Sequence, residues 1–152
     1  MTARIRKAWR VTVKGYEHSG LVYAPTAGKA RSEMYGYDAI QGVRIVDITA
    51  RRASERDITL PARDPIADLL TAKETHCLSH ANGTSYGDVN KAGYRDYFYT
   101  RYDDPPLVGL VGHGLMENMW GCEHGPPMAN TYFVLTALGK QVAASLVPEY
   151  NR

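Results

Sequence analysis

Alternation of apolar and polar residues predicts a half-buried strand over residues 9–14 and a second, shorter strand over residues 21–24. Thr26 is suited to cap a helix that Gly42 closes, and the β-branched residues of 43–50 predict a third strand. We therefore expect a β-β-α-β unit at the N-terminus. Four residues at helical spacing should face its sheet: Ala27, Ala30, Met34 and Tyr37.

Helix signals follow a charged stretch that ends near residue 64. Asp64-Pro65 is a helix opening, and Thr71-x-x-Glu74 is a capping box from which a helix should run to Asn82-Gly83. A loop over residues 83–95 then leads to a strand at 97–100.

The last third of the chain predicts a helix, a hairpin and a second helix. Asp103-Asp104-Pro105 begins the first of these helices, whose apolar stripe is Leu107, Leu110 and Val111. Residues 115–119 and 131–135 are strand-like runs around a Gly/Pro-rich tip. Thr136 caps the final helix, which carries Leu138, Val142 and Leu146 on one face.

This part of the chain resembles a known DNA-binding fold. From Leu107 to Leu146 it contains the segments LVGLVGHGLM and NTYFVLTALGKQVAASL. They resemble the third helix, the wing and the following helix of winged-helix regulators of the multiple-antibiotic-resistance type. The resemblance implies a recognition helix, but the matching helix has no Arg, Lys, Asn or Gln to read a base, and Asp103 and Asp104 would repel phosphate. We expect a degenerate winged-helix-like unit used for protein contact.

Two further segments are similar to small bacteriophage and prophage proteins. They are VYAPTAGKARSEMYG at residues 22–36 and GYRDYFYT at residues 93–100. The resemblance covers most of the chain and implies an accessory phage gene product without an established active site.

Composition and charge agree with a folded α+β protein of 152 residues, 44% of them hydrophobic. We expect a basic unit over residues 1–54, a connector over 55–64 and the winged-helix-like unit over 65–152. Residues 1–60 hold eleven Lys or Arg against six Asp or Glu (+5), and residues 61–152 hold seven against ten (−3), which sum to the net +2. The basic half is the better candidate for an anionic partner.

The same composition bears on location. No run approaches the roughly 18 apolar residues of a membrane helix, the N-terminus has no signal-peptide core, and two cysteines are too few for a disulfide framework. We expect a protein of the bacterial host cytoplasm with no membrane contact.

Two sets of residues are candidates for partner binding. The basic set suits phosphate or an acidic protein surface: Arg4, Arg6, Lys7, Arg10, Arg51 and Arg52. The second set is rich in Tyr and Arg, which favour core packing with surface cover, a protein interface or stacking on nucleic-acid bases, in that order. It comprises Tyr94, Arg95, Tyr97, Tyr99, Arg101 and Tyr102, with Asp103 and Asp104 beside it.

Metal binding and catalysis have weaker support. His76 and His80 share a helix face and would need Cys122 and His124 from the wing tip to complete a zinc site; otherwise both histidines flank a core that contains Cys77. The segment APTAGKA at residues 24–30 lacks two residues of a phosphate-binding loop, and no nucleophile motif is present. We expect no cofactor, with zinc as the alternative, and no enzymatic activity.

The sequence thus predicts a non-enzymatic phage protein that acts stoichiometrically on a host protein complex. Inhibition of a bacterial defence complex, in the manner of anti-CRISPR proteins, is its most concrete form, by analogy with other small phage proteins. The alternative is a nucleic-acid-binding transcriptional regulator, because of the wing motif and the basic N-terminal half.

Overall fold

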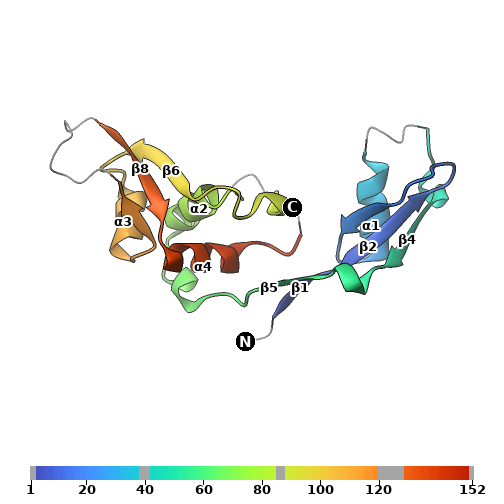
Figure 1. The fold of residues 1–152 in the computed structure, drawn as a ribbon, viewed down its shortest axis with the longest axis horizontal. Coiled ribbons are helices and arrows are strands. Elements are labelled where there is room, and N and C mark those ends of the chain that lie inside the picture. The colour runs from blue at the N-terminus through green and yellow to red at the C-terminus, as the bar shows by residue number, and fades with distance from the viewer. Residues whose placement is uncertain (1–2, 38–41, 85–87, 120–128, 151–152) are drawn as a thin grey trace. The chain divides into compact units, whose positions relative to one another are not determined.

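The computed structural model describes residues 3–37, 42–84, 88–119 and 129–150. Its fold is mixed α+β, as predicted, and its contacts divide the chain into two compact units (Figure 1). The N-terminal unit is Ala3–Leu60, and the C-terminal unit begins at Pro61. This division lies inside the expected connector; the domain limits given above stay a prediction.

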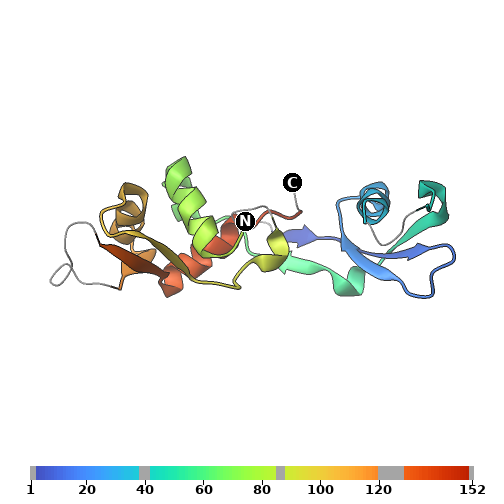
Figure 2. The same cartoon turned by 90° about the horizontal axis from the view of Figure 1, so that it is seen from above.

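A three-stranded antiparallel sheet is the framework of the N-terminal unit. In sheet order its strands are β3 (Gly20–Tyr23), β2 (Ala8–Val13) and β4 (Ile48–Arg52). Alternation along β2 turns Val11 and Val13 to one face, where they are buried with Ala30 of helix α1 (Ala27–Tyr35). Figures 1 and 2 both show α1 on one side of this sheet. Arg10 and Thr12 of β2 are exposed.

Helix α1 begins where the sequence predicts and ends earlier. The Thr26 hydroxyl accepts a hydrogen bond from the Lys29 N–H at 3.2 Å, which confirms the N-cap. The helix stops before Gly36, because this poor helix former folds its own N–H back onto carbonyls of the last turn. Closure at Gly42 was therefore wrong. Tyr37, expected against the sheet, is 67% exposed.

The third strand also starts later than predicted. Residues 45–47 form a single 3-10 turn, η2 (Ile45–Asp47), and β4 follows it. The turn is closed by a hydrogen bond from the Asp47 N–H to the Arg44 carbonyl at 2.9 Å and by an ion pair between the two side chains at 3.0 Å. This local pairing outweighs the β propensity of the residues within the turn.

A second, two-stranded sheet was not predicted. Strand β1 (Arg4–Arg6) pairs antiparallel with β5 (Ile58–Leu60), which follows a short 3-10 turn, η3 (Ser54–Arg56). Each strand has only three residues, too few to show an alternating pattern. Part of the charged connector is therefore regular structure.

The C-terminal unit has the element order of a wing. Its elements are η4 (Pro65–Asp68), α2 (Ala72–Ala81), η5 (Val89–Lys91), β6 (Tyr97–Arg101), α3 (Pro105–Gly112), β7 (Met116–Asn118), β8 (Asn130–Leu135) and α4 (Ala137–Leu146). The three strands form one antiparallel sheet in the order β6-β8-β7. The antiparallel pair β7–β8 followed by α4 is in the order that the winged-helix resemblance predicts.

Hydrogen bonds of the capping box set the start of α2. The Thr71 hydroxyl accepts from the Glu74 N–H at 3.2 Å, and the Glu74 carboxylate accepts from the Thr71 N–H at 2.8 Å. This confirms the predicted start. Asp64-Pro65, in contrast, opens only the 3-10 turn η4, in which the Asp64 side chain accepts from the Ile66 N–H at 3.0 Å.

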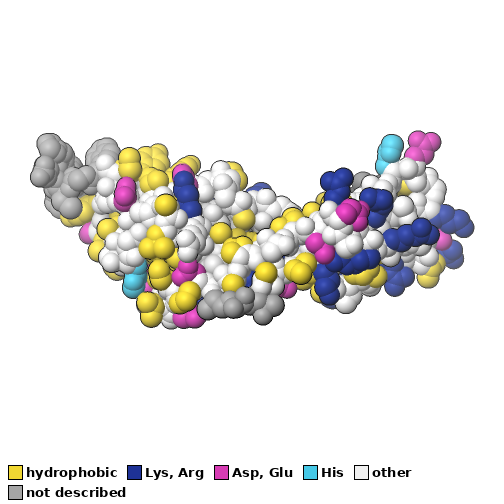
Figure 3. Space-filling view, turned by 60° about the horizontal axis from the view of Figure 1, so that its bottom comes forward, with side chains coloured by type: hydrophobic (Ala, Val, Ile, Leu, Met, Phe, Trp, Pro, Cys, Tyr) yellow, Lys and Arg dark blue, Asp and Glu magenta, His cyan; other side chains and the backbone are white. Residues whose placement is uncertain are grey.

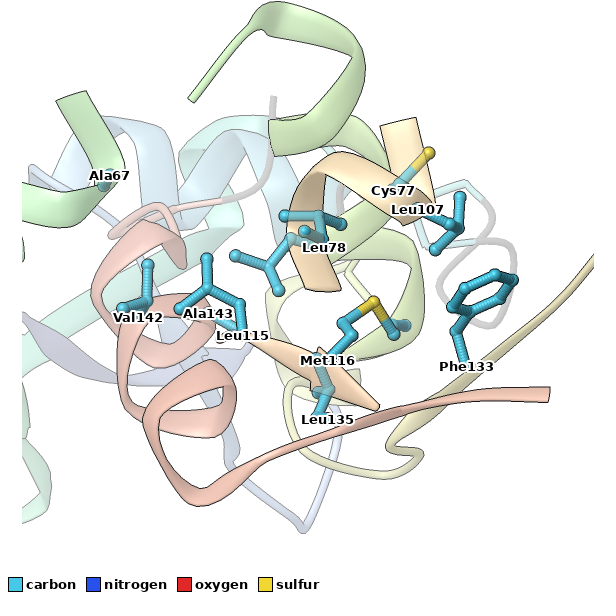
Figure 4. Packing of buried hydrophobic residues seen from close by; sticks show 12 residues of the cluster. Ala67, Cys77, Leu78, Leu107, Leu115, Met116, Phe133, Leu135, Val142 and Ala143 are labelled. Atoms are coloured by element: carbon cyan, nitrogen blue, oxygen red, sulfur yellow. The ribbon is translucent and has the colours of Figure 1, made fainter. Parts of the chain in front are cut away.

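The core of the C-terminal unit lies between its helices and its sheet (Figure 4). Leu78 of α2, Leu110 of α3, Phe133 of β8 and Val142 of α4 are almost completely buried in it. A Cβ atom at Gly139 would overlap the carbonyl oxygen of Leu115. Glycine is therefore required where α4 passes this backbone segment.

Two predicted core positions lie at the surface instead. Val111 and Leu138 are each 37% exposed. Helix α3 has eight residues and buries one narrow stripe, Leu107 and Leu110, so that Val111, about 100° further round the helix, points away from it. On α4 the buried face is formed instead by Gly139, Val142, Ala143 and Ser145.

Candidate functional site

Three tyrosines form a cluster on the exposed face of the C-terminal sheet, called the tyrosine face here. Tyr97 and Tyr99 belong to β6 and Tyr132 to β8, and they are 41%, 52% and 47% exposed. Alternation explains this placement, because the intervening Phe98 and the neighbouring Phe133 point inward to the core. The same backbone that builds the core thus presents the tyrosine rings to solvent.

The rings of the tyrosine face support each other. Tyr99 and Tyr132 are directly opposite across the strands, with ring centroids 4.7 Å apart, and the Tyr97 and Tyr132 rings meet edge to face at 5.5 Å. The Arg95 guanidinium lies 4.6 Å from the Tyr97 ring centroid and donates to the Tyr97 carbonyl at 2.9 Å. Such preorganised rings lose little conformational entropy when a partner binds.

Charges near the tyrosine face are largely compensated. Arg101 forms two hydrogen bonds to the Asp103 carboxylate, at 2.9 and 2.7 Å, and this interaction lowers the pKa of Asp103 and raises that of Arg101. The Asp104 carboxylate accepts a hydrogen bond from the Thr100 hydroxyl at 2.9 Å. The surroundings are therefore close to neutral rather than strongly positive.

The structure separates the remaining tyrosines of the predicted set from this face. Tyr94 precedes β6, and its ring packs over Gly83, while Tyr102 follows β6 and is half-buried. Sequence reasoning missed Tyr132. Its place in the strand-like run 131–135 was visible, but the register that sets it beside Tyr99 was not.

A second exposed sheet face lies in the N-terminal unit, and it is called the basic face here. Arg10 of β2 is directly opposite Arg51 of β4, and in the same pair of strands the hydroxyls of Thr12 and Thr49 are 2.6 Å apart. These four residues, together with Arg52 and Glu55, line a hollow of about 310 Å³. Figure 3 shows Lys and Arg side chains gathered over this unit. Arg10 and Arg51, far apart in sequence, thus form the centre of the face.

The other predicted basic residues form contacts with neighbouring groups or lie outside the three-stranded sheet. Arg52 bonds Asp57 with both nitrogens, donates to the Ala8 carbonyl at 2.8 Å and lies 5.6 Å from the Trp9 ring. Arg6 is buried with its guanidinium 4.7 Å from the Tyr23 ring. Arg4 belongs, like Arg6, to β1, outside the three-stranded sheet, and Lys7 is exposed between β1 and β2. Among the six predicted basic residues, Arg10 and Arg51 are therefore the exposed pair that the strand register brings together, and a single patch of all six stays a prediction.

The predicted metal ligands are only partly within the described structure. His76 is exposed on α2, and His80 packs against Phe98 with ring centroids 4.6 Å apart. Burial, Arg95 and His76 lower the pKa of His80. In the parts of the chain that the structure describes, no three metal-ligating side chains come together. Cys122 and His124 lie outside the described residues, so the zinc alternative stays a prediction.

Cys77 has the surroundings of a structural cysteine. It is buried in the core, and burial, together with the charges of Asp104 and Glu74, raises the pKa of its thiol. The protonated thiol is a poor nucleophile.

Glu74 is held by Thr71, with His113 Nε2 at 4.0 Å from its carboxylate. The Glu74 side chain, at the start of α2, thus lies close to His113 at the end of α3.

Helix α3 is the helix that the resemblance to winged-helix regulators would make the recognition helix. It is the one helix between β6 and β7, whereas a helix-turn-helix motif presents two consecutive helices. Its exposed large side chains are Val108 and Val111. Such a surface has no polar group to hydrogen-bond a base edge.

No protein-family model, curated protein or solved structure matches this chain. Among the described residues, no helix has the length and apolar character needed to cross a bilayer.

Proposed function

We propose that this protein is a non-enzymatic phage protein that binds a host protein complex stoichiometrically, with the tyrosine face as its contact surface. The observation that carries the proposal is the exposed, mutually packed cluster of Tyr97, Tyr99 and Tyr132. Tyrosine is enriched among the residues that dominate binding energy in protein interfaces. Each ring supplies a large apolar area and a hydroxyl group.

Local charge favours a protein partner over stacked nucleic-acid bases. Surfaces that bind single-stranded nucleic acid combine aromatic rings with a positively charged groove. Here Arg101 is neutralised by Asp103, and Glu117 of β7 is exposed beside β8. The apolar exposed side of α3 also supports protein contact over DNA reading, which is the alternative function.

Inhibition of a bacterial defence complex is the most concrete form of this proposal. It rests on the resemblance to small phage proteins and on analogy with them. A stoichiometric inhibitor needs a binding surface but no catalytic residues, and the tyrosine face supplies such a surface.

The test is affinity capture from bacterial lysate with the full chain, after nuclease treatment, comparing wild type with the double variant Tyr99→Ala/Tyr132→Ala. Tyr35→Ala is the matched control, because Tyr35 is as exposed (53%) but lies on α1 of the N-terminal unit. We expect wild type and control to retain the same protein in a one-to-one complex. The double variant should bind it at least about 30-fold more weakly, the loss expected for a hot spot of about 2 kcal/mol.

Two results would overturn the proposal. One is that no protein is retained after nuclease treatment. The other is that the double variant, with its thermal unfolding unchanged, retains the partner as well as the control does.

A further inference from the structure

The basic face places two like charges side by side. Arg10 and Arg51 are direct cross-strand partners, and such partners have Cβ atoms about 4.5–5.5 Å apart. Like charges in this arrangement destabilise a sheet unless an anion compensates them. A bound anionic group would therefore stabilise the Arg10–Arg51 pair.

Compensation within the described structure is weak. Arg10 is 3.4 Å from the Glu55 carboxylate, but both side chains are more than half exposed (57% and 61%), and exposed pairs of this kind contribute little. The guanidinium of Arg51 forms no hydrogen bond or ion pair with any other described residue. The single carboxylate of Glu55 therefore does not neutralise the two positive charges of Arg10 and Arg51.

The side-chain chemistry of the basic face fits double-stranded DNA. β2 is the central strand of the three-stranded sheet, so Arg10 and Arg51 lie on a sheet face that can contact the phosphate backbone of a duplex. Arginine binds phosphate and guanine through two parallel hydrogen bonds, and threonine hydroxyls also bind phosphate.

We propose that the basic face binds double-stranded DNA, with Arg10 and Arg51 contacting its phosphates or base edges and Thr12 and Thr49 beside them. The +5 charge of residues 1–60 agrees with this ligand. The site is in a different unit from the tyrosine face and shares no residue with it. The proposal therefore stands or fails independently of the protein-binding function.

The test is fluorescence anisotropy of a labelled DNA duplex of mixed sequence with the full chain, at salt concentrations between about 0.05 and 0.2 M. Arg51→Gln is compared with Arg31→Gln, which makes the same charge change on exposed α1, the helix that covers the opposite side of the sheet. One lost phosphate contact lowers the salt slope by about 0.9 and weakens binding about eightfold at about 0.1 M salt. We expect both changes for Arg51→Gln and neither for Arg31→Gln.

Glu55→Gln is expected to change DNA affinity in the opposite direction from Arg51→Gln. It removes the carboxylate that competes with DNA for Arg10, so that DNA affinity should rise. The proposal is overturned if the wild type shows no salt-dependent binding, or if Arg31→Gln weakens binding as much as Arg51→Gln. It is also overturned if polyglutamate binds as tightly as the duplex, since the face would then suit an acidic protein.

Discussion

The two units have separate hydrophobic cores. We therefore expect that a substitution in the core of one unit leaves the other unit folded. Ile48 is 1% exposed in the core of the N-terminal unit, and Leu110 is fully buried in that of the C-terminal unit. Replacing either by alanine removes buried methyl groups and leaves a cavity, at a cost of about 2–5 kcal/mol. For units of this size, a loss of about 2 kcal/mol lowers the melting temperature by at least about 8 °C.

Tryptophan fluorescence separates the two transitions. Trp9 packs against the N-terminal core and donates its indole N–H to the Ala24 carbonyl at 2.8 Å, so its emission should change when that unit unfolds. The chain has one other tryptophan, Trp120, and a Trp120→Phe background leaves Trp9 as the sole reporter. Calorimetry then follows both units together.

Ile48→Ala should shift the Trp9 transition, and Leu110→Ala should shift a calorimetric transition while the Trp9 midpoint stays in place. An equal shift of the Trp9 midpoint by both variants would refute the reasoning, because the two cores would then unfold as one cooperative unit.

Other substitutions test local contacts. Gly139→Ala should cost the C-terminal unit about 1–3 kcal/mol by overpacking, whereas Gly112→Ala, with open space around it, should stay within about 0.5 kcal/mol; urea unfolding compares the two. Arg52→Gln should lower the melting temperature of the N-terminal unit, because it removes the bonds to Asp57, whereas Arg51→Gln, which relieves a like-charge pair, should not. The hydrogen bond from Arg52 lowers the pKa of Asp57. The stabilising effect of this bond is therefore present above the ordinary aspartate pKa and is lost as the pH falls through the pKa of Asp57 in the folded protein. Asp57→Asn should flatten this part of the stability–pH curve measured by urea unfolding.

Elements with local signals could be predicted from the sequence, and elements that depend on pairing could not. Thr71 and Glu74 satisfy each other's backbone within one turn, and so the start of α2 was predictable. The end of α1 depended on which of two glycines, Gly36 or Gly42, would stop the helix, and helical spacing alone does not distinguish them. The β1–β5 pairing joins residues more than fifty positions apart through backbone hydrogen bonds, which leave no side-chain pattern.

The candidate surfaces show the same limit. The alternation in β6 predicts that Tyr97 and Tyr99 share a face, but only the strand register brings Tyr132 to them. Arg51 and Arg52 are adjacent in sequence and were grouped for that reason. Strand geometry turns successive side chains to opposite faces, so that one meets Arg10 and the other Asp57.

The two three-stranded sheets are packed in the same way but expose different surfaces. Each sheet buries one face against helices and exposes the other, on which tyrosines predominate in the C-terminal unit and arginines in the N-terminal unit. Binding through tyrosine rings depends mainly on apolar area and responds weakly to salt, whereas binding through arginines to phosphate weakens steeply as salt rises. If the capture experiment is repeated without nuclease, a high-salt wash should therefore remove DNA held at the basic face and leave a protein held at the tyrosine face. Since each surface is built from one unit's own residues, this separation holds whatever the placement of the two units.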